Sequence, residues 1–277
     1  MTRAKQITVL LVGSLALALT GALSAHAQST PRMADEVVQV SLIPGWRQSD
    51  DLHITGLRIV LAPGWKTYWR APGDSGIPTQ LSWRGSQNVA TAQIQWPRPE
   101  VFRSFGMRSI GYRGEVVLPI LIRTETPGDI RAKAKITLGV CQEICMPLSF
   151  RLTADLPREV TRRNTDIAAA LKARPLTARE AGVRGTTCSI TPRAQGLDVS
   201  VEVNIPGFSG QNPVAVIETG DSSVWVSEPR VRRAGTTITA DAQLVPQNPV
   251  FAFSRSDLRL TLLTPEKAVE IQGCSGS

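Results

Sequence analysis

Short runs of β-branched and aliphatic residues, separated by glycine and proline, constrain the fold of this chain more than any other feature. In the first half these runs occupy residues 36–43, 52–62, 115–124 and 132–140. Between them stand turn-forming sequences such as PGW, APGDSG and TPGD. Many short strands with turn signals between them are typical of an antiparallel β-sandwich, and the pattern contains no βαβ rhythm and no glycine-rich phosphate loop.

One segment breaks the β pattern, the sequence NTDIAAALKARPLTAREAG at 164–182. Asn164 or Thr165 is a suitable N-cap, alanine and leucine favour a helix, and Pro175 interrupts it. The runs LDVSVEVNI, PVAVIET, SVWVSEP, TTITADAQLV and LRLTLLTP then indicate strands again. We therefore expect an all-β chain, with a first sandwich at 34–158, a linker with a short helix at 159–182, and a second, smaller β-sandwich at 183–277.

The N-terminus resembles an export signal. Arg3 and Lys5 precede an almost wholly apolar or small stretch at 7–23, and Ala25-His26-Ala27 fits a small-x-small cleavage site. This pattern predicts a signal peptide at 1–27; a retained membrane anchor is the alternative. No later stretch approaches the roughly 18 apolar residues of a spanning helix. We expect an exported protein in the periplasm, where disulfides form.

The chain is basic, with a formal net charge of +8, which becomes +6 without Arg3 and Lys5 because residues 1–27 contain no acid. Such a charge can serve binding to a nucleic acid or an anionic membrane. Here the arginines are scattered among glycine, proline and acidic residues, which favours a solvated surface. We expect no nucleic-acid partner.

All four cysteines lie in the mature part, and an even number suggests two disulfides. Cys188 lies at the first strand of the second half, and Cys274 lies near the last residue. A bond between them closes a loop of about 87 residues, worth about 4 kcal/mol in the chain-entropy model. We predict a structural disulfide here.

Cys141 and Cys145 lie in the stretch LGVCQEICMPLSF. A disulfide between them closes a very short loop, so it stabilises the fold little, and a tight ring favours easy reduction. Strand-like flanks and Pro147 place the pair at the tip of a hairpin. The spacing leaves three uses open: a redox pair, a structural disulfide or a metal clamp.

The metal alternative is a Cu(I)-binding or copper-tolerance protein, because Cys141, Cys145 and Met146 are soft ligands. His53 is the one histidine of the mature part, the methionines form no tract, and four-ligand zinc spacing is absent. We therefore expect no metal or other cofactor. A third alternative is a non-catalytic interaction module with structural disulfides.

Three ordered blocks carry a family resemblance: PGWKTYWRAPGDSGIPTQLSW (63–83), WPRPEVFRSFGMRSIGYRGEVVLPI (96–120) and VCQEICMP (140–147). Together they resemble the N-terminal domain of DsbD-type thiol:disulfide interchange proteins, above all the ScsB-like branch linked to suppression of copper sensitivity. The resemblance covers roughly residues 36 to 157. It implies an exported, immunoglobulin-like sandwich with a redox-active cysteine pair.

By this resemblance Cys141 and Cys145 are the redox pair, with the shorter spacing of the ScsB-like motif. The resemblance also implies that Cys145 is attacked first and that Cys141 resolves the mixed disulfide. Glu143 is close in sequence and raises a thiol pKa, whereas no cation occurs before Arg151. We therefore expect no strongly activated nucleophile.

Four aromatic residues carry over as well. Phe102 and Phe105 fall where the family has a cap loop over the disulfide, and an aromatic packed on the sulfurs excludes stray thiols. Tyr68 and Trp69 fall where the family places aromatics near the site. For all four, the alternative is an ordinary place in the core.

The family implies electron flow from a membrane-embedded donor of the CcdA or DsbD type to periplasmic thioredoxin-like or other disulfide-containing proteins. This sequence shows no transmembrane helices and no thioredoxin-type CxxC motif. We therefore expect a stand-alone relay, a protein-disulfide reductase component whose electron donor is a separate protein.

Overall fold

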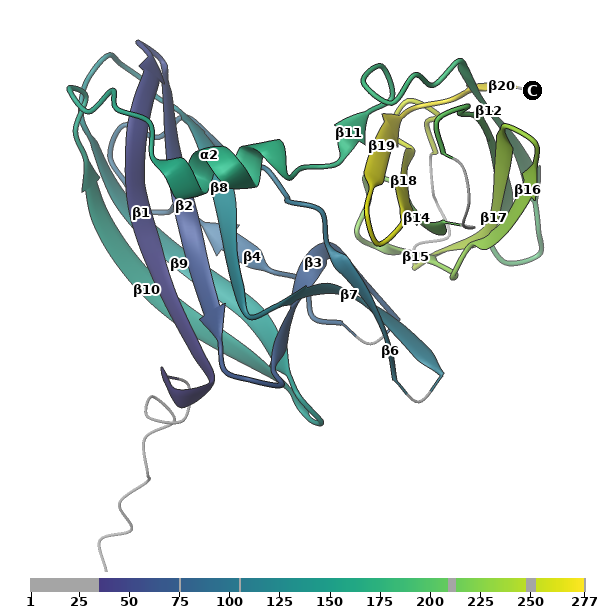
Figure 1. Ribbon diagram of the computed structural model, residues 1–277, viewed down its shortest axis with the longest axis horizontal. Helices are drawn as coiled ribbons and strands as arrows, with labels where there is room; N and C mark the ends of the chain where they lie inside the picture. Colours follow the sequence, from purple (N-terminus) through teal and green to yellow (C-terminus); the bar gives the residue numbers. More distant parts are fainter. Residues whose placement is uncertain (1–34, 75, 105, 209–212, 248–252, 277) are drawn as a thin grey trace, which may run out of the picture.

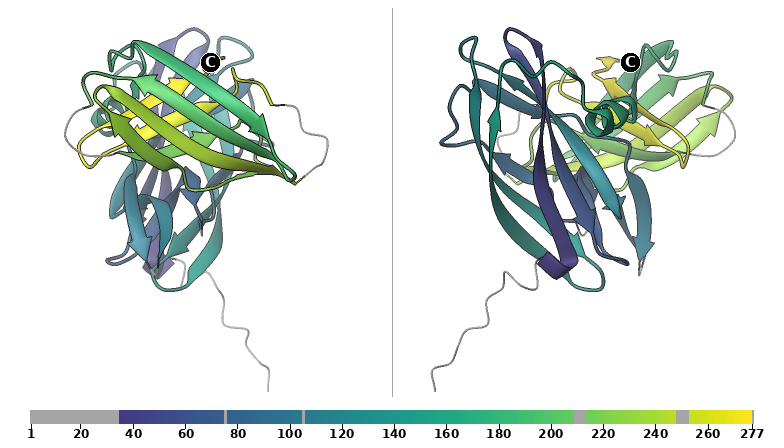
Figure 2. Two further views of the ribbon diagram at one scale, coloured as in Figure 1. Left: turned by 90° about the vertical axis from the view of Figure 1, so that its right-hand side faces the viewer. Right: turned by 60° about the vertical axis from the view of Figure 1, so that its left-hand side comes forward.

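The computed structural model describes residues 35–74, 76–104, 106–208, 213–247 and 253–276. Two β-rich lobes lie side by side, and one helix lies across the first lobe (Figures 1 and 2). No helix in the described ranges is long and apolar enough to cross a membrane. The predicted signal peptide at 1–27 lies outside the described residues.

The first lobe is a sandwich of two antiparallel sheets. One sheet has the order β1 (Val38–Ser49), β2 (Leu52–Leu61), β8 (Glu115–Arg123) and β5 (Thr91–Ile94). The other has the order β10 (Cys145–Leu156), β9 (Ile130–Cys141), β3 (Lys66–Gly73), β7 (Met107–Arg113) and β6 (Glu100–Ser104), with β4 (Gln80–Ser82) also paired to β9. In β9 the side chains of Ile130, Ala132, Ala134 and Ile136 are buried while those between them are exposed, so the period of two in the sequence directs one face to the core.

The strand β1 is longer than the sequence suggests. The PGW turn signal predicts an end near residue 43, but pairing with β2 continues to Ser49 after a register shift between Ile43 and Trp46. Gly45 has a φ of 76°, and a Cβ there would lie 1.8 Å from the carbonyl oxygen of Ile54. The Pro-Gly pair therefore forms a β-bulge within the strand instead of a turn.

The predicted linker helix is present as α2 (Thr165–Lys172). Asn164 is its N-cap and accepts hydrogen bonds from the backbone N–H groups of Asp166 and Ile167. The side chain of Ile167 is fully buried and forms a small cluster with Trp46, Ile54 and Val117. The linker is thus anchored on the outer face of the first sandwich (Figure 1).

The second lobe is also a two-sheet sandwich. One sheet has the order β11 (Leu176–Thr177), β19 (Ala268–Gln272), β18 (Arg259–Leu263) and β14 (Val214–Glu218). The other has the order β15 (Val224–Val226), β17 (Thr237–Pro246), β13 (Leu197–Asn204), β12 (Gly185–Pro192) and β20 (Ser275–Gly276), with β16 (Arg230–Ala234) also paired to β17. A disulfide joins Cys188 in β12 to Cys274. The all-β fold of two sandwiches and a linker helix is therefore confirmed.

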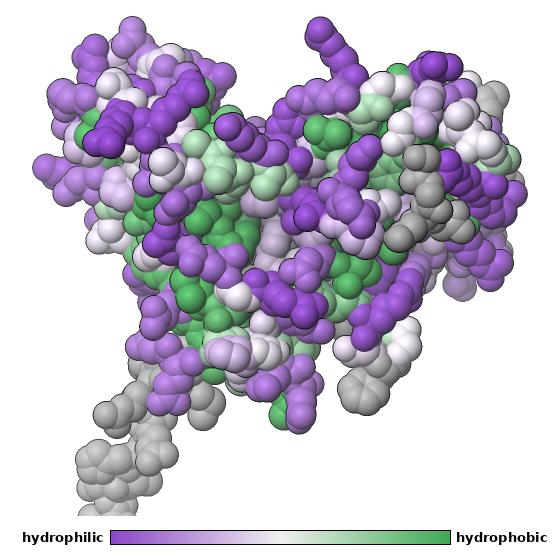
Figure 3. Space-filling model, viewed as in Figure 1, coloured by the Kyte–Doolittle hydropathy of each residue, from purple (hydrophilic) through white to green (hydrophobic). Residues whose placement is uncertain are grey.

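The two sandwiches are held together by apolar and ionic contacts. Val216, Leu263 and Ala268 of the second sandwich belong to the main hydrophobic core of the first. Arg70 in β3 forms ion pairs with Glu218 and Glu270, and its side chain is only 15% exposed. The space-filling view shows the lobes in contact, with a notch between them on the upper side (Figure 3). The second sandwich is therefore packed on the first, on the side where β3 lies.

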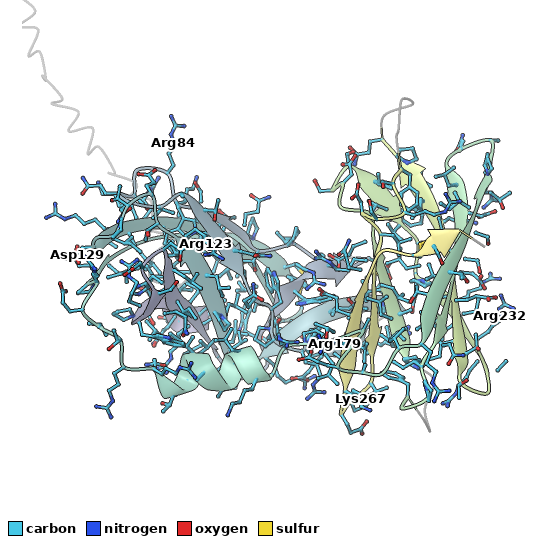
Figure 4. All side chains as sticks on the ribbon, turned by 90° about the horizontal axis from the view of Figure 1, so that it is seen from above. Arg84, Arg123, Asp129, Arg179, Arg232 and Lys267 are labelled. Atoms are coloured by element: carbon cyan, nitrogen blue, oxygen red, sulfur yellow. A yellow bond between two sulfur atoms is a disulfide. The ribbon has the colours of Figure 1, made fainter. Side chains whose placement is uncertain are left out.

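Basic side chains are spread over both lobes. Arg84 and Arg232 extend away from the body of the molecule (Figure 4) and are exposed. Arg232 pairs with Asp241 at 2.8 Å, and Arg123 pairs with Asp51. These contacts place acidic partners beside cations at the surface.

Candidate functional site

The β9–β10 hairpin ends in a disulfide. Cys141 is the last residue of β9, Cys145 is the first residue of β10, and the two face each other in the strand register. Their sulfurs are bonded and their Cα atoms are 4.1 Å apart. Cys141 is only 4% exposed, whereas Cys145 is partly exposed. An attacking thiolate therefore reaches the sulfur of Cys145 more readily.

The hydroxyl of Tyr68 lies 3.0 Å from Sγ of Cys145. A disulfide sulfur carries no proton, so the hydroxyl is the donor. Tyr68 is only 1% exposed, and this burial raises the pKa of its phenol. The phenol therefore stays protonated at neutral pH and can donate to the sulfur in either redox state.

Two glycines make room for the ring of Tyr68. A Cβ on Gly139, in β9, would lie 2.9 Å from Cδ2 of Tyr68, and a Cβ on Gly76 would lie 2.8 Å from its Cδ1. On the neighbouring residue, the hydroxyl of Thr67 donates to the carbonyl of Gly139 at 2.8 Å and ties β3 to β9. The ring is thus enclosed between β9 and the segment that follows β3, with its hydroxyl directed at the sulfur.

A basic groove borders the disulfide hairpin. Lys66 pairs with Cys141 across β3 and β9, and its ammonium donates to Ser109 at 3.1 Å. The ring of Phe102 lies between two cations, 5.4 Å from Nζ of Lys66 and 4.7 Å from the guanidinium of Arg113. Burial, and then the charge of Arg113, lower the pKa of Lys66.

This groove has a volume of about 670 Å³. Its lining includes three cations and the hairpin residue Gln142, and it includes no acid among the described residues: Leu61, Ala62, Pro63, Gly64, Trp65, Lys66, Val101, Phe102, Arg103, Ser104, Arg113, Gly114 and Gln142. Two acids at the edge compensate part of the charge, because Arg113 pairs with Glu100 and Arg103 pairs with Glu228.

A disulfide at a strand hairpin, with a tyrosine hydroxyl on one sulfur, suits thiol exchange. A family model described as the N-terminal part of thiol:disulfide interchange protein DsbD matches residues 32–157. Residues 32–157 therefore form a DsbD N-terminal-type domain. The matched residues include Cys141, Cys145, Tyr68 and the groove.

The fold also resembles a solved structure. The crystal structure of the N-terminal periplasmic domain of ScsB from Proteus mirabilis matches with a TM-score of 0.63 and 19% sequence identity. The match covers 87% of this chain and 92% of that one, so it extends beyond the DsbD N-terminal domain into the second sandwich. At this identity the likeness is one of fold. No curated protein sequence matches the chain.

Three of the four predicted aromatics are among the described residues, and these three lie in different places. Tyr68 contacts the sulfur of Cys145, whereas its neighbour Trp69 is fully buried in the core between the sheets. Successive side chains of a strand point to opposite faces, so the two cannot share one role. Trp69 therefore packs in the core, on the face away from the disulfide. Phe102 lines the groove, and Phe105 lies outside the described residues.

Sequence reasoning missed Lys66 and the glycines. No cation is close to the cysteines in sequence, but the β3–β9 pairing makes Lys66 a neighbour of Cys141. A signal existed: Lys66 precedes Tyr68 by two positions, and residues two apart in a strand share a face. Gly139 in a strand also indicated a close approach of another group.

The soft-ligand set predicted for Cu(I) is only partly assembled. Met146 packs against the core of the first sandwich. Cys145, one position earlier in β10, points to the opposite face of the sheet. His53 lies at the start of β2 and is buried. Its Nε2 is 2.6 Å from the carbonyl oxygen of Pro44. Among the described residues, no group of three or more His, Cys, Asp or Glu side chains is placed to hold a metal ion.

Proposed function

We propose that this protein exchanges disulfides through Cys141 and Cys145 in the periplasm. It relays reducing equivalents from a membrane-embedded donor of the CcdA or DsbD type to exported thioredoxin-like or other disulfide-containing proteins. The observation that carries the proposal is the partly exposed sulfur of Cys145, hydrogen-bonded to Tyr68 within a DsbD N-terminal domain. The fold similarity to a periplasmic domain of ScsB supports the compartment.

The proposed relay has two half-reactions, and each consists of two thiol–disulfide exchanges. A donor thiolate attacks Sγ of Cys145, the Cys141–Cys145 bond breaks, and Cys141 leaves as a thiolate. The second donor thiolate then attacks the donor sulfur of the mixed disulfide and releases Cys145. The donor becomes a disulfide and this protein becomes a dithiol, so two electrons have moved.

In the second half-reaction, the Cys145 thiolate attacks the disulfide of the acceptor protein and displaces one acceptor thiolate. Cys141 then attacks Sγ of Cys145 in the mixed disulfide, and the second acceptor thiolate leaves. The acceptor gains both electrons, and the Cys141–Cys145 bond forms again. The tyrosine hydroxyl stabilises negative charge on Cys145 whenever that sulfur is a thiolate.

Trapping tests the assignment of the two cysteines. The mature protein with Cys141→Ser is expected to form a stable mixed disulfide through Cys145 with an oxidised thioredoxin-like protein, because the resolving thiol is missing. The Cys145→Ser variant is expected to form none. Non-reducing electrophoresis followed by mass mapping of the linked peptides measures both.

Reduced thioredoxin serves as the donor probe for the wild-type protein. The Cys141–Cys145 disulfide is expected to become reduced while Cys188–Cys274 stays oxidised. If excess reduced thioredoxin leaves Cys141–Cys145 intact and neither variant forms a mixed disulfide, the proposed function is wrong. If only Cys145→Ser traps the partner, the order of the two cysteines is reversed.

A further inference from the structure

The second sandwich contacts the first at Arg108, a residue of β7. Arg108 is only 4% exposed, and its NH1 donates to the carbonyl of Ala215, in β14, at 3.0 Å. The same nitrogen lies 3.6 Å from Oε1 of Glu228, between β15 and β16. Glu228 also pairs with Arg103, in β6, at 2.8 Å. One carboxylate of the second sandwich thus contacts both strands of the β6–β7 hairpin.

The backbone of Arg108 holds the segment that follows β3. Its N–H donates to Oδ2 of Asp74 at 3.2 Å, and its carbonyl accepts from the N–H of Asp74 at 3.0 Å. The carboxylates of Glu228 and Asp74 both act on the guanidinium of Arg108, where they oppose the effect of burial, which lowers its pKa. Asp74 is therefore tied to a residue that the second sandwich holds.

The same segment covers Tyr68. Gly76 lies against one edge of the ring, where a Cβ would be 2.8 Å from Cδ1. Ile77 lies on the other side against Gly139, where a Cβ would be 2.6 Å from Cβ of Ile77. Because the ring is bounded on both edges, the positions of Gly76 and Ile77 determine where the hydroxyl of Tyr68 points.

We infer that Glu228 and Arg108 are positioning residues for the redox pair, and that the second sandwich acts on Cys145 through them. Contacts run from Glu228 and Ala215 to Arg108, and from the backbone of Arg108 to Asp74. Gly76, two positions beyond Asp74 in the chain, lies against the ring of Tyr68, whose hydroxyl contacts Sγ of Cys145. The second sandwich thereby holds the hydroxyl that stabilises the Cys145 thiolate. This inference rests on the proposed function for its biological meaning.

The test measures the thiol pKa of Cys145 in the full mature chain carrying Cys141→Ser, from the pH dependence of its alkylation rate. Adding Glu228→Gln is expected to lower the thiolate fraction of Cys145 at a fixed pH about threefold, since a threefold change is about half a pKa unit. Asp74→Ala, which leaves the second sandwich untouched, is expected to have the same effect. A second readout is the ionisation of Tyr68 by ultraviolet absorption, which is expected to occur at lower pH in both variants.

The tyrosine readout is resolvable because the chain has two tyrosines. The other, Tyr112, is deeply buried, which raises its pKa well above that of an ordinary phenol. Glu270→Gln is the matched control, because it removes an inter-sandwich ion pair to Arg70 and not to Arg108. It is expected to leave the thiol pKa of Cys145 unchanged. Thermal unfolding verifies that each variant is folded.

A double variant tests the route. With Tyr68→Phe already present, Glu228→Gln is expected to change the thiol pKa of Cys145 no further, because the hydroxyl it acts through is gone. If Glu228→Gln has no effect with Tyr68 intact, or the same effect without the hydroxyl, the inference is wrong. An equal effect of Glu270→Gln also overturns it. Since this assay needs no partner protein, it is independent of the trapping assay that tests the function.

Discussion

At the scale of single residues, the two cysteines of the proposed redox pair are not equivalent. Cys141 is buried and has Lys66 as a strand neighbour, while Cys145 is partly exposed and receives the hydroxyl of Tyr68. A hydrogen bond to a charged group is worth about 1.5–3 kcal/mol. The environment therefore favours Cys145 as the sulfur that meets the partner.

Tyr68→Phe is expected to raise the thiol pKa of Cys145 by about one unit, because the thiolate loses its hydrogen-bond donor. The pH dependence of alkylation in the Cys141→Ser background measures this. Tyr112→Phe makes the same change at the tyrosine whose hydroxyl donates to the carbonyl of Pro97, and should leave the thiol pKa as it was. An unchanged pKa in Tyr68→Phe would show that the hydroxyl does not act on this sulfur.

His53 makes stability depend on pH. Burial is the largest cause that lowers the pKa of its imidazole, so the folded protein binds fewer protons than the unfolded chain once the pH falls below about 6.5. The contribution of neutral His53 to the stability of the fold is therefore fully present at neutral pH and is lost on acidification. Urea unfolding at pH 7 and pH 5 is expected to show a smaller loss of stability in His53→Asn than in the wild-type protein. Equal losses would contradict this assignment.

At the scale of elements, the β9–β10 hairpin and the segment after β3 act as one unit around Tyr68. Glycine in the middle of a strand is normally unfavourable, because it adds no side chain to the packing. At Gly139 it is required, since the ring of Tyr68 and Ile77 occupy the space of a side chain.

Gly139→Ala is expected to destabilise the fold by about 1–3 kcal/mol, because the new methyl group overlaps Ile77 and the tyrosine ring. Chemical denaturation measures the change in free energy of unfolding. Gly185→Ala, in β12, is the control: a Cβ there meets no atom within 4 Å, so little loss is expected. If both variants are equally stable, the site is less tightly packed than the structure indicates.

At the scale of the whole molecule, the two disulfides close loops of very different length. Cys141–Cys145 joins residues 4 positions apart, while Cys188–Cys274 joins residues 86 apart and ties the C-terminal end to β12. The long loop adds about 4 kcal/mol in the chain-entropy model, and Cys188 is buried.

In graded dithiol buffers, Cys141–Cys145 is therefore expected to be reduced first, while the second disulfide stays intact until the protein unfolds. Mass mapping of alkylated cysteines at each buffer ratio measures the two separately. Reduction of both bonds at the same ratio would mean that Cys141–Cys145 is a structural bond, which excludes the relay.

Local patterns predicted much of this fold. Alternation and turn residues located most strands of both halves, and Asn164 was one of two predicted caps of α2. The strand-like flanks of the Cys141–Cys145 pair, with Pro147, indicated a hairpin tip. These features depend on residues close together in the chain. The Pro-Gly pair at 44–45 misled because a bulge and a turn use the same residues, and only the partner strand distinguishes them.

The sequence by itself determined the all-β class, the helix between two β-rich halves and the cysteines available for redox chemistry. Only the tertiary structure decided that Tyr68, and not Trp69, contacts the disulfide, and that Lys66 pairs with Cys141 across the strands. Tyr68 and Cys145 are 77 residues apart, and Arg108 and Ala215 are 107 apart. Contacts of that kind follow from strand register and from how one sandwich packs on the other, and neither leaves a periodic trace in the sequence.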